Sequence, residues 1–237
     1  MRRTAIALTA ILLIAGPTRA EVGPCKPDQF KGLICGEGIG AARVIDGTMS
    51  PSKRLAFAWR SLSSAPQDLL TDRQHYDLES LVIRLADGAV LSKLPGEYWN
   101  TGKAYVNRYD LTTAWSPDSR YAVEILNFRW STEQFRLYAI GADDKALVLD
   151  LKPVMEPPVR KYLGKDEGLY AFAIYGGKDG NPPMLTIDNR GRIKTTVLME
   201  KPKQGDAVTL DVTAKVVARD GALSLRDIKI RHSKVEP

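Results

Sequence analysis

Residues 97–110 contain the densest group of side chains in the sequence that are suited to binding a ligand. Aromatic rings alternate there with amides and charged groups, a combination that fits stacking on a sugar or a protein-binding hot spot. A packing role competes with this, in which Trp99 and Tyr109 fill the space between two sheets. Asn100 and Asn107 would then hold the connection in place, and we favour this packing role. The candidate binding residues are Tyr98, Trp99, Asn100, Tyr105, Asn107, Arg108, Tyr109 and Asp110.

Groups suited to catalysis are scarce in this sequence. His75 and His232 are the only histidines and lie far apart, so a His-based triad or a zinc site is poorly supplied. No Gly-x-Ser-x-Gly, His-Glu-x-x-His, EF-hand or phosphate-binding glycine pattern occurs. A carboxylate pair for glycoside hydrolysis must lie about 5–10 Å apart across a cleft, which a linear sequence does not show. We therefore expect no catalytic residue, no metal site and no cofactor.

Cys25 and Cys35 are the only cysteines. An even pair behind an export signal is typical of a disulfide, because an oxidising compartment preserves such bonds. A redox or metal pair is the alternative, but the spacing is not Cys-x-x-Cys and no histidine is near in sequence. We expect a Cys25–Cys35 disulfide that stabilises the fold by about 2.5–3 kcal/mol.

Residues 1–20 have the features of a secretory signal peptide. Arg2 and Arg3 form a basic start, residues 5–15 form a short apolar run, and Ala20 supplies the small residue before a cut. The apolar run is too short for the ~20 residues that span a bilayer. The sequence therefore predicts cleavage after Ala20, no membrane span in the mature chain, and a periplasmic or secreted location.

The charge balance gives little indication of a polyanion partner. The chain has 34 Lys and Arg residues against 28 Asp and Glu residues, a net charge of +6. Arg2, Arg3 and Arg19 belong to the leader, so the mature net charge falls to +3. No dense Lys/Arg stripe is visible along the sequence, and we expect no nucleic-acid partner.

A strand-opening pattern occurs twice. In residues 116–123, Ser-Pro-Asp-Ser forms a turn and Arg-Tyr-Ala-Val begins a strand. Residues 49–59 repeat this arrangement, with Ser50 located 66 positions before Ser116. Residues 61–79 look like a polar insertion, and without them the spacing is about 47, close to the ~40–45 residues of a propeller blade.

The sequence Ser-Pro-Asp-Ser-Arg-Tyr-Ala-Val resembles the opening signature of TolB-like and WD40-like β-propeller repeats. The resemblance covers two short stretches, and residues 166–173 are a candidate degenerate third copy. It implies a repeated sheet architecture. Such signatures occur in enzymes, receptors and scaffolds alike, so the resemblance implies little about function.

Turn chemistry places the remaining elements. Asp-Gly pairs predict hairpins at residues 86–89 and 219–222, because the two central turn positions need positive φ. Asp-Asn-Arg-Gly at 188–191 predicts another hairpin. Residues 131–134 have the composition of a turn. Residues 157–164 predict one short helix, with proline at its start and glycine past its end.

Together these patterns predict an all-β fold of antiparallel meander sheets. A propeller-like arrangement of four to five small blades, or an incomplete array of them, fits the spacing, and a β-sandwich is the alternative. We expect one domain over residues 21–232 and a flexible tail at 233–237.

The predicted function is binding of another envelope or extracytoplasmic protein without catalysis. Binding of envelope glycan such as peptidoglycan through residues 97–110 is the alternative, and a carbohydrate-active hydrolase is the third possibility. An exposed row of aromatics would favour glycan, a broad apolar patch a protein partner, and two facing carboxylates in a cleft a hydrolase.

Overall fold

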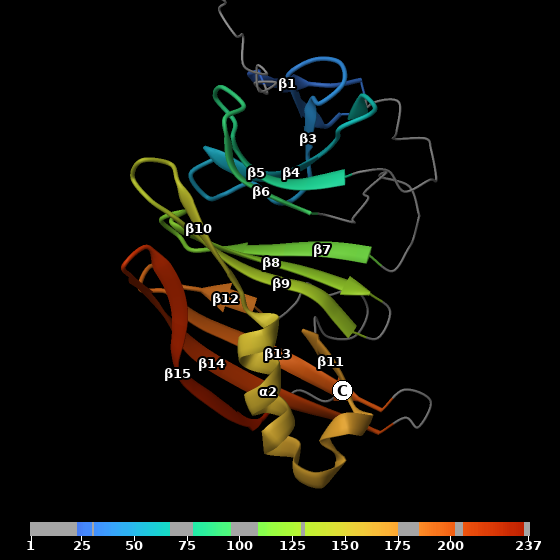
Figure 1. The fold of residues 1–237 in the computed structure, drawn as a ribbon, viewed down its shortest axis with the longest axis vertical. Coiled ribbons are helices and arrows are strands. Elements are labelled where there is room, and N and C mark those ends of the chain that lie inside the picture. The colour runs from blue at the N-terminus through green and yellow to red at the C-terminus, as the bar shows by residue number, and fades with distance from the viewer. Residues whose placement is uncertain are drawn as a thin grey trace, which may run out of the picture.

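The computed structural model describes residues 23–29, 31–66, 78–95, 109–128, 131–174, 185–201 and 206–234. In these residues the chain forms three antiparallel sheets, which follow one another along the long axis of the molecule (Figure 1). The predicted leader at 1–20 and residues 235–237 of the predicted tail lie outside the described residues. The all-β, antiparallel prediction is confirmed.

The first sheet is a six-stranded meander in which strands adjacent in sequence are adjacent in space. A disulfide joins Cys25 to Cys35, as predicted, and these residues pair across the first two strands. The strands are β1 (Cys25–Pro27), β2 (Leu33–Cys35), β3 (Ala42–Val44), β4 (Leu55–Ser61), β5 (Leu78–Arg84) and β6 (Val90–Pro95).

The second sheet is a four-stranded meander with the order β10-β9-β8-β7. Its strands are β7 (Tyr109–Trp115), β8 (Tyr121–Phe128), β9 (Ser131–Ile140) and β10 (Ala146–Asp150). The predicted turn at 131–134 is wrong, because these residues open β9 and Ser131 pairs with Phe128. The buried Thr132 is accommodated in this strand because its hydroxyl donates a hydrogen bond to Asn127 Oδ1 at 2.6 Å.

The third sheet has the order β11-β13-β14-β15, with β12 also paired to β13. Its strands are β11 (Ala171–Ile174), β12 (Leu185–Ile187), β13 (Arg192–Glu200), β14 (Ala207–Arg219) and β15 (Ala222–His232). The hairpins predicted at 188–191 and 219–222 join strands of this sheet, and the one predicted at 86–89 joins β5 to β6.

Helix α2 (Lys152–Leu163) and a 3-10 turn, η1 (Gly164–Leu169), connect the second sheet to the third. The helix begins five residues before the predicted start, with Pro153 in its first turn and Pro157 inside it. An interior proline removes a helical hydrogen bond. Met155 and Val159 are fully buried in the core between the sheets. The burial of these apolar side chains offsets the loss of helical hydrogen bonds at the prolines.

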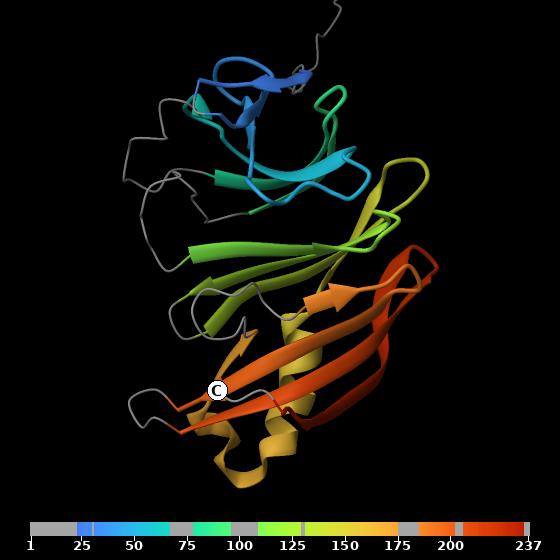
Figure 2. The same ribbon diagram turned by 180° about the vertical axis from the view of Figure 1, so that it is seen from behind.

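The middle sheet is buried on both faces, which explains the near-continuous apolar composition of β8. Ala122 and Leu126 pack towards the first sheet, whereas Val123 and Ile125 pack in the core shared with the third sheet. Side chains on a strand alternate between faces, so one strand supplies two cores. The three sheets therefore form a layered stack (Figure 2). The propeller-like arrangement with four to five blades stays a prediction.

Candidate functional site

The two Ser-Pro turns fold identically. In the first, the Lys53 N–H bonds to Ser50 O at 2.9 Å and the Leu55 N–H bonds to Ser50 Oγ at 3.1 Å. In the second, the Ser119 N–H bonds to Ser116 O at 2.8 Å and the Tyr121 N–H bonds to Ser116 Oγ at 2.9 Å. The fourth turn residue has positive φ in both, 55° and 63°. The serine stabilises the turn because its hydroxyl accepts a hydrogen bond from a backbone N–H that the turn leaves unpaired.

A third, shorter turn of this kind lies at Asp188, between β12 and β13. The Gly191 N–H bonds to Asp188 O at 2.9 Å, and Asp188 Oδ1 accepts the Arg192 N–H at 2.8 Å. An aspartate oxygen here takes the place of the serine hydroxyl. The copy predicted at 166–173 does not form such a turn, since residues 164–169 are a 3-10 helix.

These turns come together at one end of the stack, which we call the turn end. The Ser52 N–H donates to Ser119 Oγ at 3.1 Å and links the first sheet to the second. The Asp118 N–H donates to Asn189 Oδ1 at 2.9 Å and links the second sheet to the third. Arg120 also donates to Asn189 O at 3.2 Å. Residues about 70 positions apart in sequence thus form one hydrogen-bonded surface.

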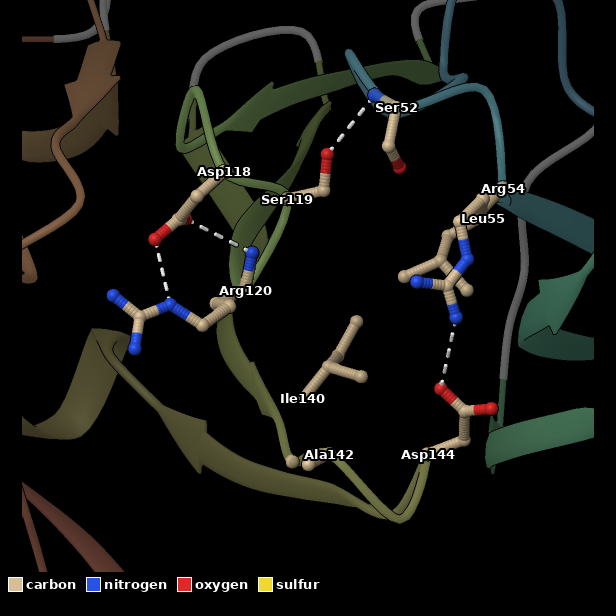
Figure 3. Close-up of a pocket in the computed structure, with 10 residues that line it drawn as sticks. Ser52, Arg54, Leu55, Asp118, Ser119, Arg120, Ile140, Ala142 and Asp144 are labelled. Atoms are coloured by element: carbon tan, nitrogen blue, oxygen red, sulfur yellow. Dashed lines mark hydrogen bonds and ion pairs between the residues drawn. The ribbon is translucent and has the colours of Figure 1, made fainter.

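A pocket of about 200 Å³ opens between the first two turns (Figure 3). Leu55 and Ile140 supply its apolar surface, and charged groups surround it. Pockets for drug-sized ligands have about 300–1,000 Å³, so this one fits a single side chain or a small polar group. The lining residues are Ser52, Arg54, Leu55, Asp118, Ser119, Arg120, Ile140, Gly141, Ala142 and Asp144.

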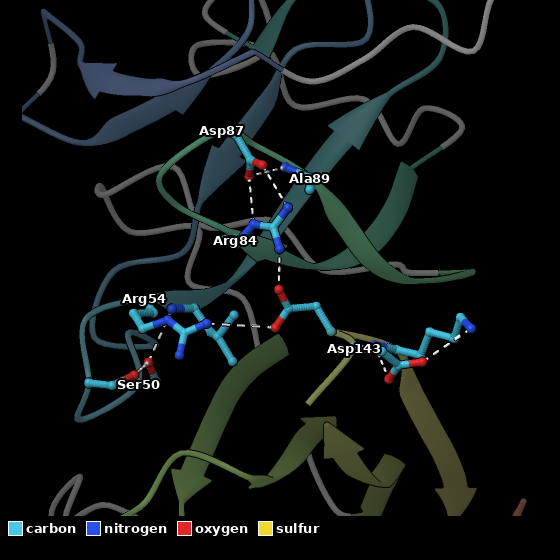
Figure 4. A network of polar contacts seen from close by, with 10 residues as sticks. Ser50, Arg54, Arg84, Asp87, Ala89 and Asp143 are labelled. Carbon is cyan, nitrogen blue, oxygen red and sulfur yellow. Dashed lines mark hydrogen bonds and ion pairs between the residues drawn. The ribbon is translucent and has the colours of Figure 1, made fainter. Parts of the chain in front are cut away.

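Asp144 is the carboxylate shared by two arginines of the first sheet, Arg54 and Arg84, which are labelled in Figure 4. Arg84 pairs with Asp144 and also with Asp87 at 2.7 Å, and the hydrogen bond from Arg84 lowers the pKa of Asp87 to about 2. Arg54 lies 3.8 Å from Asp144, a looser ion pair, and its side chain is 68% exposed. The Arg54 side chain is therefore able to turn towards a partner while the ion pair between Asp144 and Arg84 stays in place.

On the other side of the pocket, Arg120 pairs with Asp118 at 2.6 Å. Desolvation raises the pKa of Asp118, but hydrogen bonds from Ser116 and Arg120 outweigh it and leave the pKa below its usual value. An ionised, paired carboxylate is a poor general acid or base at neutral pH. Asp118 is therefore suited to binding a charged group rather than to acid–base catalysis.

Six of the eight predicted site residues, Tyr98, Trp99, Asn100, Tyr105, Asn107 and Arg108, lie outside the described residues. Tyr109 and Asp110 open β7, where their backbones pair with Phe128 and Asn127. They lie at the end of β7 away from Ser116, and a seven-residue strand is about 20 Å long. The structure does not bring these two residues to the pocket.

Sequence reasoning missed the residues that surround the pocket. It recognised the Ser-Pro segments only as turns that open strands, and it assigned no role to Asp144. The signal available was the repeated turn itself, since equivalent turns of stacked sheets lie at the same end. The ion pairs of Asp144 depend on the packing of the first sheet against the second, which no local pattern indicates.

A second unusual group is Glu124, which is fully buried between the first two sheets. The Tyr138 hydroxyl donates to its Oε2, and Arg136 lies 4.0 Å from that oxygen. Its Oε1 has no hydrogen-bond partner among the described residues. Burial raises the pKa of Glu124, and the Tyr138 hydrogen bond and the Arg136 charge offset this only in part.

We expect Glu124→Gln to stabilise the protein at pH 8 and to change it little at pH 4. The folded protein holds the Glu124 proton to higher pH than the unfolded chain does, so its stability falls as pH rises above the unfolded value of 4.5. Glutamine removes this loss, and each kcal/mol gained raises the melting temperature by about 2–4 °C. Thermal unfolding at pH 4, 6 and 8 measures the difference, and a difference that is constant with pH would contradict the prediction.

Among the residues that the structure describes, no three His, Cys, Asp or Glu side chains are arranged to hold a metal ion. The same residues contain no helix of the length and apolar character needed to cross a membrane. Comparison of the chain with protein-family models, curated proteins and solved structures found no match.

Proposed function

We propose that this chain is an exported protein that binds another extracytoplasmic protein through the turn end, without catalysing a reaction. The observation that carries the proposal is the hydrogen bonding of three turns from three sheets into one charged surface. The disulfide is consistent with an oxidising, extracytoplasmic compartment. The resemblance of the Ser-Pro turns to TolB-like repeats supports a propeller-like scaffold and stays part of the proposal.

Arg54 and Arg120 are the proposed anchors for the partner. Their side chains are 68% and 63% exposed, and both line the pocket. Arginine is enriched in binding hot spots, and a surface that is already rigid loses less entropy on binding. An acidic side chain of the partner would enter the pocket and replace Asp144 as the ion-pair partner of Arg54.

The two alternative functions differ in their support. Six of the eight residues proposed to bind glycan lie outside the described residues, so this function stays a prediction. A hydrolase gains no support from the carboxylates around the pocket, because Asp118 and Asp144 are each paired with arginine.

Photo-cross-linking in the native host tests the turn end. A photoreactive residue at exposed position 53 is expected to capture a protein partner, and Arg54→Ala with Arg120→Ala is expected to reduce the captured product at least tenfold. Position 161, exposed on α2, is the control site. Equal amounts of captured product from positions 53 and 161 would show that the turn end is not the binding surface. The same conclusion would follow if replacing the two arginines left the amount of captured product unchanged. A parallel pull-down on peptidoglycan tests the glycan alternative.

We also expect export with cleavage after Ala20. The mature protein from the native host is expected to begin at Glu21, because the short apolar run and the small residue before the cut are typical of a cleaved signal peptide. Intact-mass measurement decides this, and a mature chain that keeps Met1 would contradict it.

A further inference from the structure

The outer face of the third sheet contains five basic residues from three strands: Arg192, Lys194, Lys215, Arg226 and Lys229. We call this surface the basic face. On β13 these residues alternate with Ile193 and Val197, which are buried in the core. Alternation places Arg192 and Lys194 on the opposite side of the sheet. Helix α2 packs in that same core, and Figure 2 shows the strands of the third sheet in front of it. All five basic residues are exposed.

Strand register aligns these charges in rows. Arg192 pairs with Lys215, and Lys215 pairs with Arg226, so three cations lie directly opposite one another on adjacent strands. In the next row, Lys194 and Lys229 lie on either side of Thr213. Neighbouring strands are about 4.8 Å apart. Like charges directly opposite in a sheet destabilise it, so this arrangement has a cost that packing alone does not explain.

The carboxylates nearby do not neutralise the five cations. Asp211 pairs with Arg231 at 3.1 Å in the following row, and Asp220 pairs with Arg219 at 3.2 Å. Asp188 accepts backbone N–H groups, although the charge of Arg192 also lowers its pKa. Asp227 follows Arg226 at a backbone position with φ of 54°. No ion pair within 4.0 Å joins the five cations to a carboxylate among the described residues.

We propose that the basic face binds the surface of an anionic phospholipid membrane by electrostatic attraction. The described residues of this face carry no aromatic ring, so the stacking that binds single-stranded nucleic acid is missing. Rows of Lys and Arg on a sheet match a layer of lipid phosphates. Each basic residue close to an anionic membrane strengthens binding about fivefold. This inference goes beyond the proposed protein partner and rests on a different surface.

Vesicle co-sedimentation of the mature protein tests the proposal. Vesicles containing phosphatidylglycerol are expected to bind the protein, and vesicles of phosphatidylcholine alone are not. Replacing Lys194, Lys215 and Lys229 with glutamine is expected to weaken binding about a hundredfold, because three charges are lost at about fivefold each. Raising the salt from 0.1 M to 1 M is expected to abolish binding, since the screening length falls from about 10 Å to about 3 Å.

The matched control replaces three exposed lysines elsewhere, Lys53, Lys145 and Lys161, with glutamine and changes the net charge equally. This control variant is expected to bind vesicles nearly as well as the unmodified protein. Equal losses in both triple variants, binding to neutral vesicles, or no vesicle binding would each overturn the proposal. So would binding of an oligonucleotide or polyglutamate in preference to vesicles. Cross-linking at position 53 in the basic-face variant is expected to be unchanged, which separates this proposal from the protein-binding function.

Discussion

Replacing Phe57 with alanine is expected to lower the free energy of unfolding by about 3–5 kcal/mol, the range for removing a buried aromatic ring. Phe57 is fully buried between the first and second sheets. Its ring centre lies 5.6 Å from that of Trp115 and 5.3 Å from that of Tyr138, and both partners belong to the second sheet. Alanine would leave a cavity where the two sheets meet, so the first sheet would lose much of its attachment.

Chemical denaturation followed by tryptophan fluorescence and by far-UV circular dichroism measures this effect. Leu62→Ala is the control, because Leu62 is 55% exposed and its removal should change stability by less than about 0.5 kcal/mol. Phe135 lies in the core between the second and third sheets. We expect Phe135→Ala to lower the free energy of unfolding by a similar amount to Phe57→Ala, and we expect unfolding to occur in one transition. A Phe57→Ala protein as stable as the Leu62→Ala control would contradict the packing of the two sheets.

Removing the Cys25–Cys35 disulfide is expected to cost about 2.5–3 kcal/mol, because the reduced unfolded chain gains conformational freedom. Cys35 is fully buried and packs beside Ala42 and Val44 in a small core of the first sheet. The double variant Cys25→Ser and Cys35→Ser should therefore unfold at lower temperature. Its largest effect should be on the β1–β2 hairpin.

Thermal unfolding with and without a reducing agent checks the disulfide prediction. The reductant is expected to lower the melting temperature of the unmodified protein and to leave that of the double variant unchanged. The double variant therefore controls for effects of the reductant other than reduction of the disulfide. Quantitative labelling of both thiols in the native exported protein would show that the bond is absent there.

The sequence alone predicted the elements that depend on neighbours a few residues apart. The hairpin at 219–222 forms as expected, since Asp220 and Gly221 both have the positive φ that such a turn needs. A hairpin also forms at 86–89, but only Gly88 has positive φ there, so the turn differs from the expected one. The sequence failed where tertiary contacts replaced local preference. Residues 131–134 have turn composition, yet Thr132 donates to Asn127 and accepts the Ile174 N–H at 2.8 Å, so this buried polar side chain is satisfied within a strand.

The sequence predicted less of the candidate site. Composition indicated residues 97–110, because aromatic and amide side chains are concentrated there. The turn end has no unusual composition in any one segment, and its residues come from turns about 70 positions apart. Only the stacking of the sheets places Arg54 and Arg120 around one pocket.

The distribution of charge shows most clearly what the sequence determines and what only the tertiary structure determines. Composition sets a small net positive charge, and the order of residues sets the alternation with a period of two that favours strands. It shows no basic stripe, because Arg192, Lys215 and Arg226 are separated in sequence by strand and turn residues. Their alignment depends on strand register, which burial of one face of each strand selects. A shift of one residue would turn these cations towards the core, so the tertiary structure alone decided that they form one surface.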